Sequence, residues 1–205
     1  MSDSADRDRL LGNLRSRIAD ERVLAAVAEV PRELFVAPAL GRFAYLDRPL
    51  PIGGGQTISQ PTLVARMCEL LELSDDDVAL DVGTGSGYHA ALLSRLCRHV
   101  YGIELDEELA AQAARSLELA GIDNVTVVAG DGAAGLPEHA PYDAINVAAT
   151  ARGDVPAALL EQLAVGGRLL APVAGGDGER LVLLRRDPEG VQRTLLDAVR
   201  FVPLR

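Results

Sequence analysis

The sequence contains no lysine, because all 20 of its Lys-or-Arg positions are arginine. Schiff-base chemistry and the Walker phosphate loop both need a lysine, so both are excluded. Basic residues are also the minority, since 30 acidic residues give a net charge of −10 and an isoelectric point near 4.8. A nucleic-acid-binding face must neutralise phosphates with positive charge, and no nucleic-acid partner is therefore expected.

Cysteine and histidine are scarce as well. Cys68 and Cys97 are too few and too far apart for a metal cage, and each lies in an apolar helical stretch, so we expect buried free thiols. The three histidines show no spacing typical of metal ligands, and no metal site is predicted. No run of 18 apolar residues occurs, and the first residues are polar and charged. These absences predict a soluble, cytoplasmic protein without a membrane partner.

A glycine-rich stretch, VALDVGTGSGY (residues 78–88), organises the rest of the chain. Its apolar start predicts a buried parallel strand that enters a tight turn, and a helix is expected over 90–96. The alternate glycines Gly83, Gly85 and Gly87 allow a positive φ and a close approach of a ligand. The start of the helix offers free N–H groups to a carboxylate or a phosphate. An ordinary turn between a strand and a helix is the alternative.

The next strand ends in an acid. Residues 99–103 form a strand-like run before Glu104, which lies 17 positions after Gly87. In doubly wound folds, an acid at the tip of the second strand holds the ribose hydroxyls of a bound nucleoside. A solvated acid at a strand end is the alternative, and the neighbouring glycine turn makes it the weaker one. The spacing G-x-G-x-G, where dinucleotide sites have G-x-G-x-x-G, favours S-adenosylmethionine over NAD.

The remaining pattern is that of an α/β doubly wound fold, in which strands and helices alternate. Before residue 35, helix-spaced apolar positions predict two short helices with a solvated charged face, and Pro31 ends the second helix or opens a third. No chemistry is expected in this part. Further strands are predicted over 125–128, 142–147, 167–173, 180–185 and 195–202, the last two as an antiparallel pair, and helices over 61–73, 105–120 and 157–163.

A long segment rich in glycine and proline, residues 44–61, precedes the helix that begins at Pro61. Its interleaved apolar residues argue against disorder, and we expect an irregular, functional loop. Ser59 or Gln60 could simply cap the helix, and from spacing alone capping is favoured over catalysis for Ser59. Neither Ser59 nor Ser86 fits the G-x-S-x-G pattern of an esterase nucleophile.

Five segments together resemble those of one family. They are VPRELFV (30–36), AYLDRPLPIGGGQTISQP (44–61), LDVGTGSGY (80–88), GDG (130–132) and PYD (141–143). With these segments the chain resembles the protein-L-isoaspartate O-methyltransferases from about residue 30 to residue 204. A glycine turn alone would match any S-adenosylmethionine enzyme, whereas DRPLPIG…QTISQP is typical of this family.

The resemblance implies a doubly wound, seven-stranded, Rossmann-like methyltransferase fold with an N-terminal helical extension. A single domain, 1–205, would have the extension and a substrate loop in residues 1–60 and the cofactor-binding sheet in 61–205. Asp131 would hydrogen-bond the adenine amino group, although an acid in such a turn is also a common helix cap. The implied S-adenosylmethionine-binding residues are Asp81, Gly83, Thr84, Gly85, Ser86, Gly87, Glu104, Leu105, Asp131 and Gly132.

The implied reaction is methyl transfer to the free carboxylate of L-isoaspartyl residues in damaged proteins and peptides. The ester would close to a succinimide and reopen partly as aspartate. A sulfonium is an excellent leaving group and the carboxylate is already ionised at neutral pH, so orientation and exclusion of water supply most of the rate. Ser59 would be the catalytic residue that orients the carboxylate, and Gln56, Thr57 and Ile58 would form the substrate loop. A monomer is expected.

Two places depart from the family pattern. The chain has AATARGD (148–154) where the family has a Thr-Ala-Ala-Ala-Pro-like run, and Asn146 stands where Ile or Val is expected. These departures bear on substrate choice more than on cofactor binding. Three alternatives stay open: a carboxylate O-methyltransferase for a dedicated peptide or protein partner, a module that binds S-adenosylmethionine without turnover, and, least supported, an NAD oxidoreductase.

Overall fold

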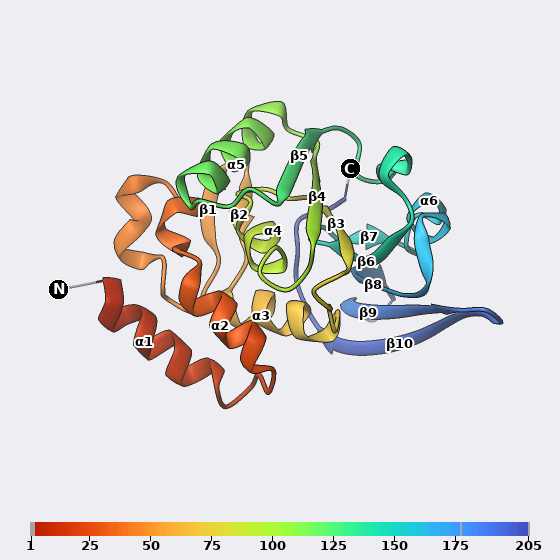
Figure 1. Cartoon of the computed structure of the whole chain (residues 1–205), viewed down its shortest axis with the longest axis horizontal. Coiled ribbons are helices and arrows are strands. Elements are labelled where there is room, and N and C mark those ends of the chain that lie inside the picture. Colours follow the sequence, from red (N-terminus) through yellow and green to blue (C-terminus); the bar gives the residue numbers. More distant parts are fainter. Residues whose placement is uncertain (1–2, 177, 205) are drawn as a thin grey trace.

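The computed structural model describes residues 3–176 and 178–204. A mixed β-sheet crosses the molecule between layers of helices (Figure 1). Five neighbouring strands are parallel and two antiparallel strands extend one edge, which confirms the predicted doubly wound sheet and its antiparallel pair. In spatial order the strands are β5 (Val125–Ala129), β4 (His99–Glu104), β3 (Val78–Val82), β6 (Tyr142–Val147), β8 (Leu163–Gly175), β9 (Gly178–Asp187) and β10 (Gly190–Ala198), and the short β7 (Ala151–Arg152) pairs with β8.

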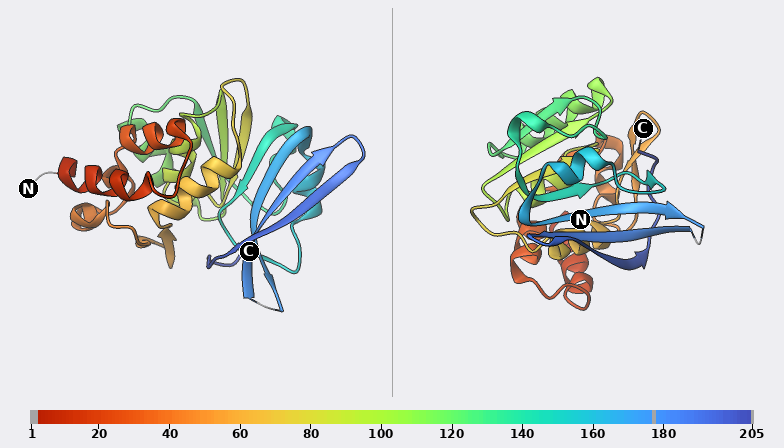
Figure 2. Two further views of the ribbon diagram at one scale, coloured as in Figure 1. Left: turned by 90° about the horizontal axis from the view of Figure 1, so that it is seen from below. Right: turned by 90° about the vertical axis from the view of Figure 1, so that its right-hand side faces the viewer.

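Apolar side chains form two cores on the opposite faces of the sheet. In β9, Leu181 and Leu183 belong to one core, while Val182 and Leu184 belong to the other. This alternation follows from the two-residue period of a strand. The smaller core lies under α6 (Ala157–Glu161), and the β9–β10 hairpin projects on the side away from the amino terminus (Figure 2). The larger core lies under α1 (Asp3–Leu14), α2 (Glu21–Glu29), α3 (Pro61–Leu70), α4 (Tyr88–Leu93) and α5 (Glu107–Leu119).

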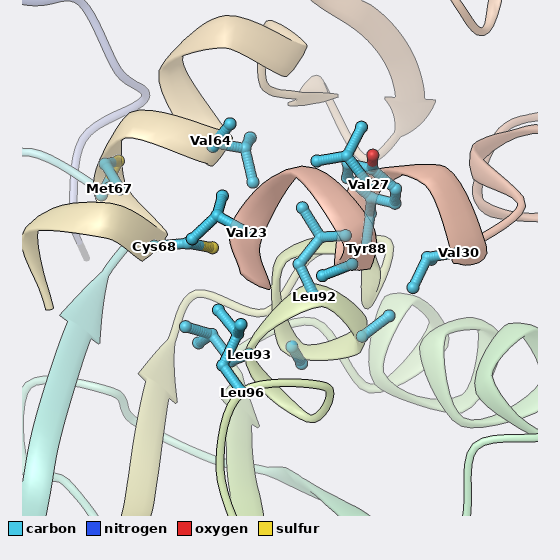
Figure 3. Packing of buried hydrophobic residues seen from close by; sticks show 14 of the residues in the cluster. Val23, Val27, Val30, Val64, Met67, Cys68, Tyr88, Leu92, Leu93 and Leu96 are labelled. Atoms are coloured by element: carbon cyan, nitrogen blue, oxygen red, sulfur yellow. The ribbon is translucent and has the colours of Figure 1, made fainter. Parts of the chain in front are cut away.

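The N-terminal helices are part of this larger core. Val23 and Val27 of α2 pack beside Val64 of α3 and the buried face of α4 (Figure 3). Pro31 opens a third, short helix, η1 (Arg32–Phe35), and η2 (Pro38–Phe43) follows it. Most charged residues of this part are exposed as predicted, but Arg32 is fully buried, so the expectation of a solvated face is wrong for it.

The expectation of an irregular loop over 44–61 is wrong in part. β1 (Leu50–Gly53) and β2 (Gln56–Ile58) form an antiparallel hairpin there. Three successive glycines, Gly53, Gly54 and Gly55, have positive φ and form its turn. Leu50 and Ile52 are the buried positions of β1, and this pattern is too short to stand out among prolines and glycines.

The cap of α3 comes from a residue that spacing does not suggest. Gln60 occupies the N-cap position, but no side chain there caps the helix. Instead, Asp47 accepts hydrogen bonds from the Thr62 N–H (2.9 Å) and the Thr62 hydroxyl (2.7 Å). Burial opposes the ionisation of Asp47, yet the bonds from Thr62 and Gln60 outweigh it and lower the pKa of this carboxyl. Ser59 therefore does not serve as the cap.

Some element boundaries also differ from the predicted ones. α3 ends at Leu70, α4 begins directly after Gly87, and β8 already begins at Leu163. The last strand is β10 rather than 195–202. The sequence did not reveal its start, because the side chains of β10 are mostly exposed and form no apolar face. Residues 199–204 instead cross to Thr150, with which Pro203 forms an isolated bridge.

Cys68 and Cys97 are buried free thiols, as predicted. Burial raises the pKa of Cys97 to about 12, so this side chain is a neutral thiol near pH 7. Within residues 3–176 and 178–204, no helix is long and apolar enough to cross a membrane. The same described ranges hold no group of three His, Cys, Asp or Glu side chains that could bind a metal ion.

Candidate active site

The glycine turn lies at the carboxyl end of β3 and leads directly into α4. Gly83, Gly85 and Gly87 have φ values of +78°, +56° and +88°, which residues with a Cβ rarely adopt. The N–H groups of Gly83 and Thr84 both donate to the Ile103 carbonyl near the end of β4, at 2.9 and 3.2 Å. The alternate glycines are therefore required by the path of the chain, which folds tightly against the second strand.

Thr84 fixes the turn to the end of β3. Its hydroxyl donates to the Asp81 carbonyl at 2.9 Å, and its side chain is buried. Gly102 of β4 leaves the space for it, because a Cβ at that position would lie 2.6 Å from Thr84 Oγ1. A threonine in the turn and a glycine in the neighbouring strand thus fit one another.

Glu104 ends β4 and turns back toward the glycine turn. Its Oε2 accepts from the Gly85 N–H at 2.8 Å, and its Oε1 accepts from the Asp106 N–H at 3.1 Å. Glu104 is only 9% exposed, so it is not the solvated strand-end acid of the alternative interpretation. Both carboxylate oxygens keep free lone pairs for further donors. Glu104 is therefore oriented before any ligand arrives.

A cavity of about 290 Å³ opens between the glycine turn and the segment that carries Ser59. It brings together residues predicted for the cofactor and residues predicted for the substrate, which lie far apart in the sequence. The glycine turn lies close to the β1–β2 hairpin: a Cβ on Gly85 would lie 3.2 Å from Ile52 Cδ1. Of the predicted residues, the cavity is lined by Gln56, Thr57, Ile58, Ser59, Gly83, Thr84, Gly85, Ser86, Glu104, Leu105 and Gly132.

Three predicted residues lie outside the lining. Asp81 is fully buried in β3, and Gly87 is the N-cap residue of α4, where a Cβ would approach Ala113 of α5 to 3.2 Å. Asp131 is exposed, and its Oδ1 accepts from the Ala133 N–H at 2.8 Å, as a turn-capping acid does. The structure thus places Asp81 and Gly87 behind the cavity, and gives Asp131 a local structural bond.

Asp81 belongs to a buried polar group with Asn146 and His89. The Asn146 amide donates to Asp81 Oδ1 at 2.6 Å, and lies 3.1 Å from His89 Nδ1. Burial raises the pKa of Asp81 to about 6, while the bonds from Asn146 and Thr84 oppose the rise. Burial also lowers the pKa of His89 to about 3, so its imidazole is neutral near pH 7. Asn146 therefore contacts two buried groups and is not among the residues that line the cavity.

The Ser59 segment is held by a residue that the sequence did not suggest. Arg32 donates from Nη2 to the Ser59 carbonyl and from Nε to the Ala44 carbonyl, both at 2.8 Å. Its guanidinium lies over the ring of Tyr88, 4.6 Å from the centroid, and Tyr88 lines the cavity. Burial raises the pKa of Tyr88 to about 12, which keeps the phenol neutral. The only sequence signal for Arg32 was its place in the VPRELFV segment.

Residues 202–204 also line the cavity, although the predicted strand ended at residue 202 and no site residue was expected here. The Thr150 N–H donates to the Val202 carbonyl at 2.7 Å, and the Leu204 N–H donates to the Thr150 carbonyl at 2.9 Å. Glu179 accepts from the Thr150 hydroxyl and from the Phe201 N–H, both at 3.0 Å. These contacts join distant parts of the chain, so no local pattern in the sequence marks them.

The divergent segment 148–154 contributes to the cavity only at its start. Ala148 and Ala149 line it, whereas Arg152 is an exposed residue of β7. Asp154 pairs with Arg193 of β10 at 2.8 Å, away from the lining. The change from threonine to alanine at 148 is therefore the part of this departure that reaches the site.

The parallel sheet, the G-x-G-x-G turn and the pinned Glu104 beside one cavity define an S-adenosylmethionine-dependent methyltransferase. A family model described as protein-L-isoaspartate(D-aspartate) O-methyltransferase (PCMT) matches residues 5–205. The chain belongs to this family.

Individual relatives agree with the family model. The chain is 54% identical over 189 residues to protein-L-isoaspartate O-methyltransferase 2 of Pelobacter propionicus, covering 91% of this chain and 84% of that protein. It is 50% identical to the protein-L-isoaspartate O-methyltransferase of Koribacter versatilis, covering 97% and 90%.

Two solved structures share the whole fold. A protein-L-isoaspartate O-methyltransferase has a TM-score of 0.86 at 30% identity, and the match covers 96% of this chain and 65% of that longer chain. A structure of the same family from Plasmodium falciparum, in complex with S-adenosyl-L-homocysteine, has a TM-score of 0.82 at 27% identity and covers 96% and 97%.

Proposed function

We propose that this protein transfers the methyl group of S-adenosylmethionine to the free carboxylate of L-isoaspartyl residues in damaged peptides and proteins. One observation carries the proposal: the Ser59 segment and the glycine turn with Glu104 line the same cavity. A methyl donor and a carboxylate could thus meet in one space. Family membership supports the choice of the isoaspartyl carboxylate as the acceptor.

The cavity suits the proposed cofactor. Glu104, already held by two N–H groups, would accept hydrogen bonds from the ribose hydroxyls. The turn residues 83–86 would hold the methionyl part, with Leu105 and Gly132 beside the base. A glycine is needed at 132 for this turn to pack against β3, because a Cβ there would lie 2.6 Å from Val82 Cγ1. The roles of Asp81 and Gly87 are indirect in this arrangement, and adenine binding by Asp131 remains a prediction.

The reaction needs orientation more than acid–base chemistry. Bound S-adenosylmethionine supplies a methyl group on a positively charged sulfur, which is an excellent leaving group. The isoaspartyl carboxylate is ionised at neutral pH, so no general base has to remove a proton. The Ser59 hydroxyl orients this carboxylate, and Thr57 and Ile58 form the adjoining wall. The resulting ester closes to a succinimide, which reopens partly as normal aspartate.

The proposal is tested with labelled S-adenosylmethionine and two matched peptides, one isoaspartyl and one aspartyl. Base-labile label on the isoaspartyl peptide alone is expected. Cofactor binding with label on neither peptide would overturn the proposed acceptor and favour a dedicated peptide partner, for which the altered position 148 is the structural hint. A monomer and a cytoplasmic location remain predictions from the sequence.

A further inference from the structure

Arg32 is a buried cation directly behind the cavity. Its side chain has no exposure to solvent, and arginine keeps its charge in proteins. Burial lowers the pKa of its guanidinium, and the neighbouring Tyr88 opposes this shift. Two of its nitrogens donate to the carbonyls of Ala44 and Ser59, and the third, Nη1, is buried without a hydrogen-bond partner.

Within the described part of the chain, no Asp or Glu forms an ion pair with Arg32. Asp47 is the carboxylate with the strongest electrostatic influence on it, but the Asp47 oxygens already accept from Thr62 and Gln60. An unpaired buried charge is costly to a fold unless something compensates for it.

The cavity itself has the opposite imbalance. Its ionisable lining includes the carboxylates of Glu104 and Asp106, and no arginine is among the lining residues. The lining therefore offers a substrate carboxylate neutral side chains and two acids, but no lysine or arginine cation. Arg32 is separated from the cavity by Ser59 and Tyr88, both of which it contacts. Because Arg32 is fully buried, its charge is screened less than a charge on the surface and acts over several ångströms.

We propose that Arg32 recognises the negative charge of the substrate carboxylate from behind the Ser59 wall, as a positioning residue that does not touch the substrate. This inference rests on the proposed function. In the reaction, a carboxylate oxygen forms a bond to the methyl carbon while the carbon–sulfur bond breaks and its electron pair stays on sulfur. No proton moves. The acceptor loses its negative charge in this step, so its attraction to Arg32 ends with the reaction. The loss of this attraction favours release of the ester.

The test separates charge from structure. Peptide affinities are measured by calorimetry with S-adenosylhomocysteine present, for an isoaspartyl peptide and for the same peptide with its free carboxylate replaced by a carboxamide. Arg32→Met should weaken the carboxylate peptide on the order of tenfold or more, as expected for a unit charge a few ångströms away, and leave the carboxamide peptide within about twofold. Arg32→Lys should retain most of the preference for the carboxylate, because it keeps the charge.

A matched control is Arg168→Met. Arg168 also ties two carbonyls, those of Leu71 and Glu72, but it lies near the amino ends of the strands and pairs with Asp77. The Arg168→Met substitution should leave the ratio of the two peptide affinities unchanged.

Each outcome has a distinct meaning. If Arg32→Met lowers the affinities of both peptides equally, Arg32 has a structural role only and the inference is overturned. If the methionine variant does not fold, an equal loss of both affinities in Arg32→Lys has the same meaning. Unchanged affinities would overturn it as well. A wild-type protein that does not prefer the carboxylate peptide would overturn the proposed function together with the inference, and this result is read before any variant is made.

Discussion

The amide of Asn146 donates to the carboxylate of Asp81 across 2.6 Å, between two neighbouring parallel strands and at positions with no solvent exposure. The same amide lies 3.1 Å from the ring of His89, a residue of the cavity wall. The polar side chain of this buried strand thus supplies the hydrogen-bond donor that a buried acid and a buried imidazole need.

Replacing this amide should therefore cost stability. Asn146→Leu keeps the size of the side chain but removes both hydrogen bonds, and it leaves Asp81 Oδ1 without its donor. We expect a loss of about 2–4 kcal/mol in the free energy of unfolding, measured by denaturant titration. A double-mutant cycle with Asp81→Asn should show that most of this loss depends on the acid. A loss well below about 1 kcal/mol would mean that the bond adds little.

The titration of Asp81 should appear in the pH dependence of stability. Its pKa of about 6 in the folded protein lies above the ordinary value of 3.8, so the folded state binds the proton more tightly than the unfolded state. The stabilisation by this proton is complete below about pH 4 and is lost as the pH rises through 6. Relative to Asp81→Asn, the wild type should lose up to about 3 kcal/mol between pH 4 and pH 7. A difference that stays constant over this range would contradict the shift.

Ser59→Ala tests the catalytic assignment. The change removes the hydroxyl of a residue that lines the cavity but keeps the backbone carbonyl to which Arg32 donates. We expect kcat to fall by about tenfold to a hundredfold, the loss of one hydrogen bond to a charged group, with nearly unchanged cofactor affinity. Ser94→Ala, which removes a buried hydroxyl bonded within α4, is the control. A parallel loss of cofactor affinity in Ser59→Ala would rule out the assignment.

Glu104→Ala should have the reverse effect. It removes the proposed acceptor for the ribose and frees the N–H groups of Gly85 and Asp106. We expect the Kd of S-adenosylhomocysteine, measured by calorimetry, to rise by at least about tenfold. Glu104→Gln should be intermediate, and the exposed Glu107→Gln should bind normally. An unchanged Kd in Glu104→Ala would refute the ribose role.

The sequence predicts those parts of the molecule whose signals are local. Apolar runs predict the parallel strands. The turn glycines and Glu104 predict a nucleoside site, because both signals lie within short segments of the sequence. The β1–β2 hairpin, the exposed strand β10 and the cap from Asp47 carry no comparable pattern. Arg32, His89 and residues 202–204 join the site through tertiary contacts alone, which periodicity and spacing cannot reveal.

Ser59 lies between two fixed points, since Arg32 binds its carbonyl and Asp47 fastens the next turn of chain through Thr62. Its conformational entropy is therefore lost when the protein folds, and little remains to be lost when a substrate binds. Damaged peptides are flexible and lose much of their own freedom on binding. Because Ser59 is already ordered, only the peptide loses conformational entropy on binding. This suits an enzyme whose substrates share one atypical linkage and little else.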